Sequence, residues 1–81
     1  MIDVLFFASI REQLGVDKLS IEHALNVDQL IAQLIDREGY AWAEVLCAPN
    51  VIVAVNQEVA DRSCVLQDGD EVAFFPPVTG G

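Results

Sequence analysis

The sequence ends in residues whose types suit chemistry at a carboxylate: Pro76, Pro77, Val78, Thr79, Gly80 and Gly81. Two consecutive prolines are stiff and direct the chain away from a preceding domain. The two glycines carry no side chain, so they can thread a narrow channel that any Cβ would block. They also leave the terminal carboxylate open to attack a nucleotide phosphate, which would activate it. An ordinary frayed terminus is the alternative, because a terminal Gly-Gly alone does not specify a function.

Other residues that could do chemistry do not form a recognisable site. His23 lies on an expected strand with no Ser or Cys nucleophile and third residue to match it, so we do not expect a catalytic base there. Asp68, Asp70 and Glu71 cluster at an expected turn, where solvation explains them without a metal ion. No glycine-rich phosphate loop is present. The sequence therefore predicts no metal site and no bound cofactor.

The two cysteines, Cys47 and Cys64, are far apart and form no CxxC motif. In a cytosolic chain such cysteines are expected as reduced thiols rather than as a disulfide. We expect the cytoplasm because residues 1–7 carry an acid where a signal peptide would carry lysines or arginines. No apolar run approaches the roughly 20 residues that a membrane span requires, so no membrane partner is expected.

Composition limits the class of protein. The chain has 81 residues, 53% of them hydrophobic, and a formal net charge of −9 at pH 7. That length allows one domain, and that hydrophobicity argues against disorder. The acidic balance argues against nucleic-acid binding, because phosphates would be repelled. The charge is equally consistent with solubility alone and with a partner that has a positive docking surface.

The elements that must position the terminal segment begin with two strands. Residues 2–9 are rich in β-branched and aromatic types, which is typical of a strand. Residues 10–14 predict a short helical turn that ends at Gly15, and residues 17–23 alternate as a second, antiparallel strand. One face of the first strand is wholly apolar and should point into the core: Ile2, Val4, Phe6 and Ala8.

Two helices are expected next. Asn26 with Gln29 resembles a capping box, and apolar residues at helical spacing continue until Gly39 ends the main helix. Residues 40–47 predict a second, shorter helix that stops before a proline. Trp42 in this helix is expected to anchor the core rather than to form a ligand platform, because a small domain needs large apolar anchors.

The second half of the chain predicts further strands. Residues 51–55 are apolar throughout, so that strand should be central or covered on both faces. After a turn at 56–58, residues 59–65 are short and irregular, and residues 67–70 give a strong turn signal. Residues 71–75 form the last strand, which the prolines end. This order predicts a two-layer α+β domain with a mixed sheet of four to five strands, in which the first and last strands lie parallel at the centre.

These patterns, taken with the terminal segment, resemble the small subunits of molybdopterin synthase. The resemblance is carried by the sequence FFPPVTGG at residues 74–81 and by DGDEV at residues 68–72. The opening residues 4–8, the pair at 11–12 and residues 54–56 match that family too. The resemblance covers essentially the whole chain and is stronger at both ends than between them.

The resemblance implies a ubiquitin-like β-grasp domain over residues 1–76 and a flexible sulfur-carrying tail over residues 77–81. In that family an E1-like adenylating enzyme uses ATP to form an acyl-adenylate on the residue that corresponds to Gly81, next to Gly80. A sulfur donor system then replaces the adenylate, which leaves a thiocarboxylate. The tail enters the active site of the large synthase subunit, and sulfur passes to cyclic pyranopterin monophosphate to make molybdopterin. The chain would be enzymatic only as this small subunit, in a complex of two small and two large subunits.

A docking surface is expected on the outer face of the sheet. Leu5 and Phe7 should lie there beside Ala73 and Phe75, and together with Val59 they would form an apolar patch typical of an interface. The alternative is that one of the phenylalanines only caps the core. Arg11 is a further candidate, as a cation that pairs with an acid on a partner. The residues expected to contact partners are Phe7, Arg11, Val59, Phe75, Pro76, Pro77, Val78 and Thr79.

Three other functions stay open at this point. The sulfur could go to thiamine, to thiolated tRNA or to another product. The chain could instead be a ubiquitin-like modifier that is attached to lysines through Gly81. It could also be a β-grasp interaction module whose tail is inert, in which case removing the last two glycines would change nothing.

Overall fold

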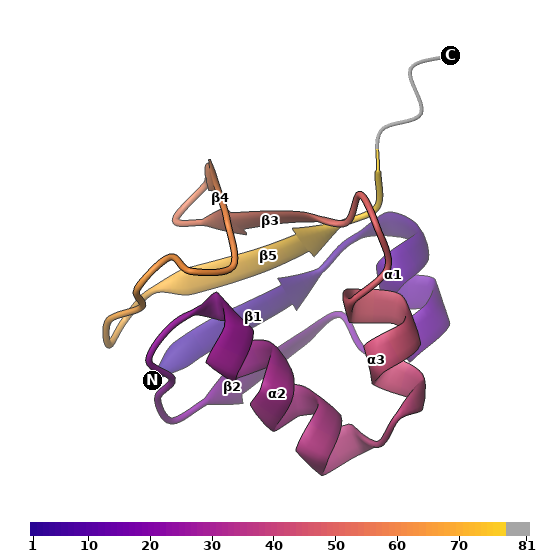
Figure 1. The fold of residues 1–81 in the computed structure, drawn as a ribbon, viewed down its shortest axis with the longest axis horizontal. Helices are drawn as coiled ribbons and strands as arrows, with labels where there is room; N and C mark the ends of the chain where they lie inside the picture. Colours follow the sequence, from indigo (N-terminus) through magenta and orange to yellow (C-terminus); the bar gives the residue numbers. More distant parts are fainter. Residues whose placement is uncertain (78–81) are drawn as a thin grey trace.

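The computed structural model describes residues 1–77, which form one mixed sheet with helices against one face (Figure 1). The strands are β1 (Ile2–Phe6), β2 (Lys18–Ile21), β3 (Ile52–Val55), β4 (Glu58–Ala60) and β5 (Glu71–Phe75). The helices are α1 (Ala8–Leu14), α2 (Val27–Glu38) and α3 (Ala41–Leu46). The hydrophobic core lies between the helices and the inner face of the sheet.

The strand order across the sheet is β2-β1-β5-β3-β4. The strands β1 and β5 are parallel neighbours at the centre, and every other pair is antiparallel. This topology confirms the predicted two-layer α+β domain, the antiparallel first pair of strands and the parallel pairing of the first strand with the last. Because β2 and β4 form the edges, β3 is an interior strand, as its wholly apolar sequence predicted.

The predicted strand over residues 2–9 is too long. The strand β1 ends at Phe6, and α1 begins at Ala8, whose φ of 52° turns the chain out of the extended conformation. This turn lets Ile10 enter the core, where it is 3% exposed, whereas Ala8, expected in the core, is exposed. An isoleucine removes more apolar area from water than an alanine, so burial favours the helix over a longer strand. The predicted helical turn over residues 10–14 is therefore the second half of a longer helix.

The two helix ends predicted from glycines are confirmed. Gly15 follows α1 with a φ of 72°, and its N–H donates to the carbonyl oxygen of Arg11 at 2.9 Å. Gly39 follows α2 with a φ of 106°, and its N–H donates to the carbonyl oxygen of Ile35 at 2.8 Å. Both positions lie in the left-handed half of backbone space, which a residue with a Cβ rarely adopts.

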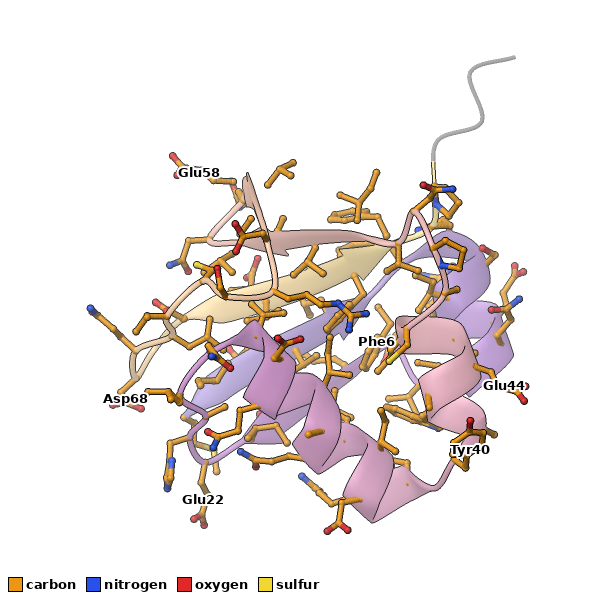
Figure 2. All side chains as sticks on the ribbon, in the orientation of Figure 1. Phe6, Glu22, Tyr40, Glu44, Glu58 and Asp68 are labelled. Carbon is orange, nitrogen blue, oxygen red and sulfur yellow. The ribbon has the colours of Figure 1, made fainter. Side chains whose placement is uncertain are left out.

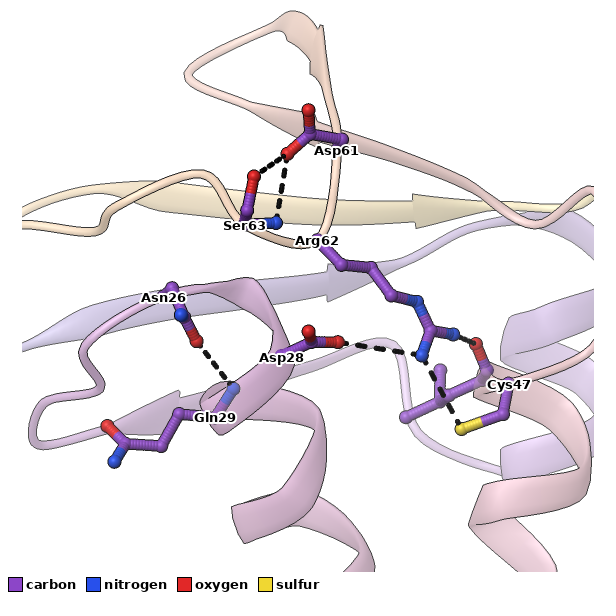
Figure 3. Close-up of polar contacts among 8 residues, drawn as sticks. Asn26, Asp28, Gln29, Cys47, Asp61, Arg62 and Ser63 are labelled. Carbon is purple, nitrogen blue, oxygen red and sulfur yellow. Dashed lines mark hydrogen bonds and ion pairs between the residues drawn. The ribbon is translucent and has the colours of Figure 1, made fainter.

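The start of α2 is capped as the sequence predicted. The Oδ1 atom of Asn26 accepts a hydrogen bond from the backbone N–H of Gln29 at 2.8 Å (Figure 3). The side chain of Gln29 in turn accepts from the N–H of Leu25, one residue before the cap, rather than from the cap residue itself. The helix then buries one apolar stripe against the sheet: Val27, Leu30, Ile31 and Leu34.

Aromatic rings form the centre of the core. The ring of Phe6 lies edge-on to Trp42 of α3, with centroids 5.5 Å apart, and points from β1 into the space under that helix (Figure 2). The same ring stacks on Phe74 of β5 at 5.7 Å. Trp42 is 7% exposed, which confirms it as a core anchor. Edge-to-face and stacked pairs of this kind add about 0.5–1.5 kcal/mol each beyond the burial of their area.

Two tight turns frame the second half of the sheet. Asn56 and Gln57 join β3 to β4 with positive φ angles of 51° and 71°, the pattern of a two-residue hairpin turn whose twist matches the strands. Gly69, with a φ of 91°, forms the turn before β5, where Asp70 Oδ2 accepts from the N–H of Gln67 at 2.8 Å. The second turn confirms the sequence prediction, whereas the first is shorter than the predicted 56–58, because Glu58 already pairs with Val55 as the first residue of β4.

Backbone hydrogen bonds from Val27 and Asp28 to the carbonyl oxygens of Cys64 and Arg62, together with the Arg62 side chain, tie the irregular segment after β4 to the helices. Arg62 donates to the carbonyl oxygen of Leu46 at the end of α3 at 3.0 Å, and its other terminal nitrogen lies 3.7 Å from Asp28 in the first turn of α2 (Figure 3). The guanidinium also lies 3.9 Å from the thiol sulfur of Cys47. Arg62 therefore joins two helix ends to a loop that has little regular structure of its own.

Within residues 1–77, no helix is long and apolar enough to cross a bilayer. In the same part of the chain, no three His, Cys, Asp or Glu side chains are placed to hold a metal ion. Cys47 and Cys64 are free, the first exposed and the second half-buried. The strand predicted over residues 17–23 is shorter in the structure, because β2 ends with the buried Ile21. His23 therefore lies exposed on the loop that follows β2.

Candidate functional site

The predicted reactive residues Gly80 and Gly81, with Val78 and Thr79, lie outside the described residues. The structure does describe the place from which they leave the domain. Pro76 is half-buried and Pro77 is exposed, directly after the last residue of β5. The surface around this point is what a partner of the terminal segment would meet first.

A stacked pair of phenyl rings lies on the outer face of the sheet, at the end of β5. The rings of Phe7 and Phe75 are nearly parallel, at 6°, and their centroids are 4.7 Å apart. Phe7 is 37% exposed and Phe75 is half-buried, and neither belongs to the hydrophobic core. The alternative that these rings only cap the core does not fit this arrangement.

One row of residues crosses all five strands on this face. In order from β2 to β4, the register places Lys18, Leu5, Ala73, Ala54 and Val59 side by side. The adjacency expected between the first and last strands is present, and Val59 ends the row with 80% of its surface exposed. The row is apolar over four of the five strands.

A shallow groove of about 330 Å³ runs over the outer face. Its residues come from the ends of β1 and β3, from the β3–β4 hairpin and from β5: Phe7, Ile52, Ala54, Gln57, Val59, Glu71, Ala73 and Phe75. A larger and more open hollow of about 610 Å³ lies where β3 and β4 approach Pro77. The groove contains the stacked rings together with Ala73 and Val59 of the predicted apolar patch, whereas Leu5 does not line it.

The other end of the outer face is acidic. Asp3 of β1 and Glu71 of β5 are register partners, and alternation places both on the face of Leu5 and Phe75. The outer face is thus apolar where β5 ends and acidic where β5 begins. Arg11 is exposed on α1 and does not line the groove.

The carboxylates with shifted pKa values, Asp61 and Asp68, lie outside the groove. Hydrogen bonds from the Ser63 hydroxyl and backbone lower the pKa of Asp61 in the loop after β4 (Figure 3). A hydrogen bond from the N-terminal ammonium of Met1, together with its charge, lowers the pKa of Asp68. Both shifts have local causes, and neither Asp61 nor Asp68 lines the groove.

Sequence reasoning missed part of the groove. It did not single out Ile52, because β3 is apolar throughout and its two faces cannot be told apart by alternation, and it placed Gln57 only in a turn. It placed Glu71 in the last strand but did not assign its side chain to a face, although the strand parity with Phe75 places it on the outer face. Counting back from Phe75 by two would have found it.

Comparison with known proteins gives a family and close relatives. The model of the ThiS family matches residues 4–81. The molybdopterin synthase sulfur carrier subunit of Escherichia coli is 42% identical over 81 residues, an alignment that covers 100% of both chains. The similarity therefore includes the terminal residues that the structure does not describe.

Two solved structures are similar in fold. A chain from the complex of subunits 1 and 2 of the molybdopterin-converting factor of Helicobacter pylori has a TM-score of 0.67 and 30% identity, over 99% of this chain and 97% of that one. The protein SAMP1 of Haloferax volcanii has a TM-score of 0.79 at 24% identity, over 99% and 98% of the two chains. The fold is therefore the ubiquitin-like β-grasp that the resemblance implied.

Proposed function

Because the chain belongs to the ThiS family and, within it, to the molybdopterin synthase sulfur carrier subunits, we propose that it delivers sulfur on the carboxylate of Gly81. The observation that carries the proposal is the 42% identity to the Escherichia coli sulfur carrier subunit over the full length of both chains. The names of the relatives favour molybdopterin as the product over thiamine or thiolated tRNA. On this proposal the protein works in the cytoplasm, where ATP is available.

The chemistry requires activation of a poor leaving group. An oxygen of the Gly81 carboxylate attacks the α-phosphate of ATP on an adenylating enzyme, which releases pyrophosphate and leaves an acyl-adenylate. Sulfide from a donor attacks the acyl carbon and displaces AMP, so that the product is a thiocarboxylate. The sulfur then passes to cyclic pyranopterin monophosphate in the large synthase subunit. The acid–base groups for this last step belong to the large subunit.

The domain acts as a handle for the terminal segment. Four residues follow Pro77, so the Gly81 carboxylate reaches at most about 14 Å beyond it when the chain is fully extended. The stacked rings of the groove lie directly before Pro76. A partner that docks at the groove therefore fixes the point from which the terminal segment extends. A partner that binds the groove thereby brings the sulfur close to its own reactive groups. This proximity accelerates the sulfur transfer.

The proposed partners are the large synthase subunit, an adenylating enzyme and a sulfur donor system. The Helicobacter pylori complex of two converting-factor subunits supports the first of these. The groove supports it too, because a contiguous apolar surface with exposed Phe7 and Val59 is typical of a binding face. The contacts of Pro76, Pro77, Val78, Thr79 and Arg11 with these partners remain part of the proposal.

Intact-mass measurement tests the proposal directly. The purified chain is incubated with ATP, an adenylating enzyme and a sulfur donor, beside a variant that lacks Gly81 and a control in which ATP is omitted. We expect the full chain alone to gain the mass difference between one sulfur and one oxygen atom. An unchanged mass in the complete mixture would exclude the thiocarboxylate carrier and leave the inert-tail interaction module as the better explanation.

A further inference from the structure

The groove on the outer face has two chemically different ends. The stacked rings of Phe7 and Phe75 form the end next to Pro76, and Glu71 lines the opposite end. Between them the floor consists of the small residues Ala54 and Ala73, both less than 10% exposed. From Glu71 to Phe75 the strand advances about 13 Å. The groove therefore follows the length of β5, with an apolar floor and a carboxylate at one end.

A second carboxylate lies beside Glu71. Asp3 is its register partner on the parallel strand β1 and points to the same face. Within residues 1–77 neither carboxylate takes part in an ion pair; Asp3 accepts only from the Ser20 hydroxyl at 3.2 Å. Lys18 lies in the next row, beside Leu5, and makes no ion pair with Asp3. Like charges placed directly opposite each other on a sheet lower its stability. The described domain thus places two like charges side by side and pairs neither of them with a cation.

From these features, and resting on the proposed function, we propose that the groove binds an arginine or lysine side chain of the large synthase subunit. The aliphatic stem lies on Ala54 and Ala73, and the cationic head lies between Glu71 and Asp3. Long basic side chains bury their stems on apolar surface while their charged ends meet a carboxylate. The net charge of −9 favours such a partner, and the groove continues directly into the proposed apolar docking patch.

This contact gives the docked domain a direction. The two carboxylates lie where the parallel strands β1 and β5 begin, and the stacked rings and Pro76 lie where they end, so the cation and the apolar patch hold the domain at two points about 13 Å apart. A single apolar contact would leave the domain free to rotate about it. Attachment at two points aims the terminal segment at one place on the large subunit.

Binding of the full-length chain to the purified large subunit tests the proposal. The test variants are Glu71→Gln and Asp3→Asn, singly and together, and Glu44→Gln on the exposed side of α3 is the matched control (Figure 2). We expect each test variant to weaken binding about tenfold, as the loss of a charge-assisted contact does. The double variant should also show slower association and a smaller dependence on salt. Glu44→Gln should bind as the unaltered chain does.

A stability measurement separates this role from a structural one. Removing the like-charge pair should raise the melting temperature of the free double variant by about 2 °C, although its binding is weaker. A lower melting temperature would indicate that the carboxylates support the fold, and would overturn the proposal.

Two further outcomes are distinguishable. If the double variant binds normally while Phe75→Ala binds weakly, or if only binding to an adenylating enzyme is affected, the groove holds no cation of the large subunit and this inference fails alone. If the unaltered chain does not bind the large subunit at all, the proposed function fails and the inference fails with it.

Discussion

The two faces of the central strands each have a stacked pair of phenylalanines, but only the pair on the inner face is buried. Phe6 and Phe74 stack on the inner face, each no more than 2% exposed, while Phe7 and Phe75 stack on the outer face and remain partly open to water. Two adjacent phenylalanines thus stand where β1 ends and α1 begins, and two more end β5; in each pair one ring faces the core and one faces outward. Trp42 packs edge-on against Phe6 of the inner pair, whereas the outer pair lies outside the hydrophobic core. Aromatic stacking alone therefore does not identify a core. The rings belong to the core only where other residues bury them.

The largest expected effect comes from the inner face. Phe74→Ala removes a fully buried ring that contacts Phe6, and should lower the free energy of unfolding by about 3–5 kcal/mol. Because small domains are stable by only about 5–15 kcal/mol, much of the population would unfold on mild heating. Urea denaturation followed by circular dichroism measures this change. A loss below about 1 kcal/mol would mean that the two faces are energetically alike.

A smaller effect, of a different kind, is expected from the outer face. Phe75→Ala should leave the fold intact, with a change in stability below about 1 kcal/mol, and should weaken binding to the large subunit by about 2 kcal/mol. Calorimetric titration measures the affinity, and the same urea experiment provides the comparison with Phe74→Ala. Unchanged affinity would remove the stacked rings from the docking surface.

The smallest effect distinguishes a carboxylate that has an ion-pair partner from one that has none. Asp68 pairs with the N-terminal ammonium, which lowers its pKa below the usual 3.8, whereas Glu71 of the outer face has no ion-pair partner within residues 1–77. A lowered pKa in the folded state means that Asp68 adds stability above pH 3.8 and that this contribution disappears as pH falls below it.

The matched variants should therefore act in opposite directions. Asp68→Asn should lower the melting temperature slightly at pH 7 and not at pH 2, and Glu71→Gln should raise it at pH 7. Differential scanning calorimetry at the two pH values measures both. Shifts of the same sign at pH 7 would contradict the distinction between the two carboxylates.

The sequence was sufficient to predict features that depend on local pattern. The parity of β1 and β5 placed Leu5 and Phe75 on the outer face, the caps located α2, and the paired first and last strands followed from the order of elements. The fold and much of the apolar patch could be predicted in this way, because alternation and capping act over a few residues. The roles of the predicted contact residues are not tested by the structure.

Features that depend on register or on competition for the core could not be predicted. The opposition of Asp3 and Glu71 exists only because two strands from distant parts of the chain pair in one register. The end of β1 was predicted wrongly because Ile10 competes for the core more strongly than Ala8, and that competition depends on where α1 can pack. Local propensity contains neither kind of information.

The parallel pairing of β1 with β5 has a consequence for how this chain folds while it is being synthesised. Val72 pairs with Val4, 68 positions earlier in the chain, so the centre of the sheet cannot form until nearly all of the sequence has been made. Until then β1 has an unpaired edge, and Phe6 and Phe7 at its end are exposed. Nascent chains in this condition aggregate or recruit chaperones. Such long-range contacts are also associated with slow folding. A chain truncated before residue 71 should therefore accumulate as an aggregation-prone fragment rather than as a smaller folded domain.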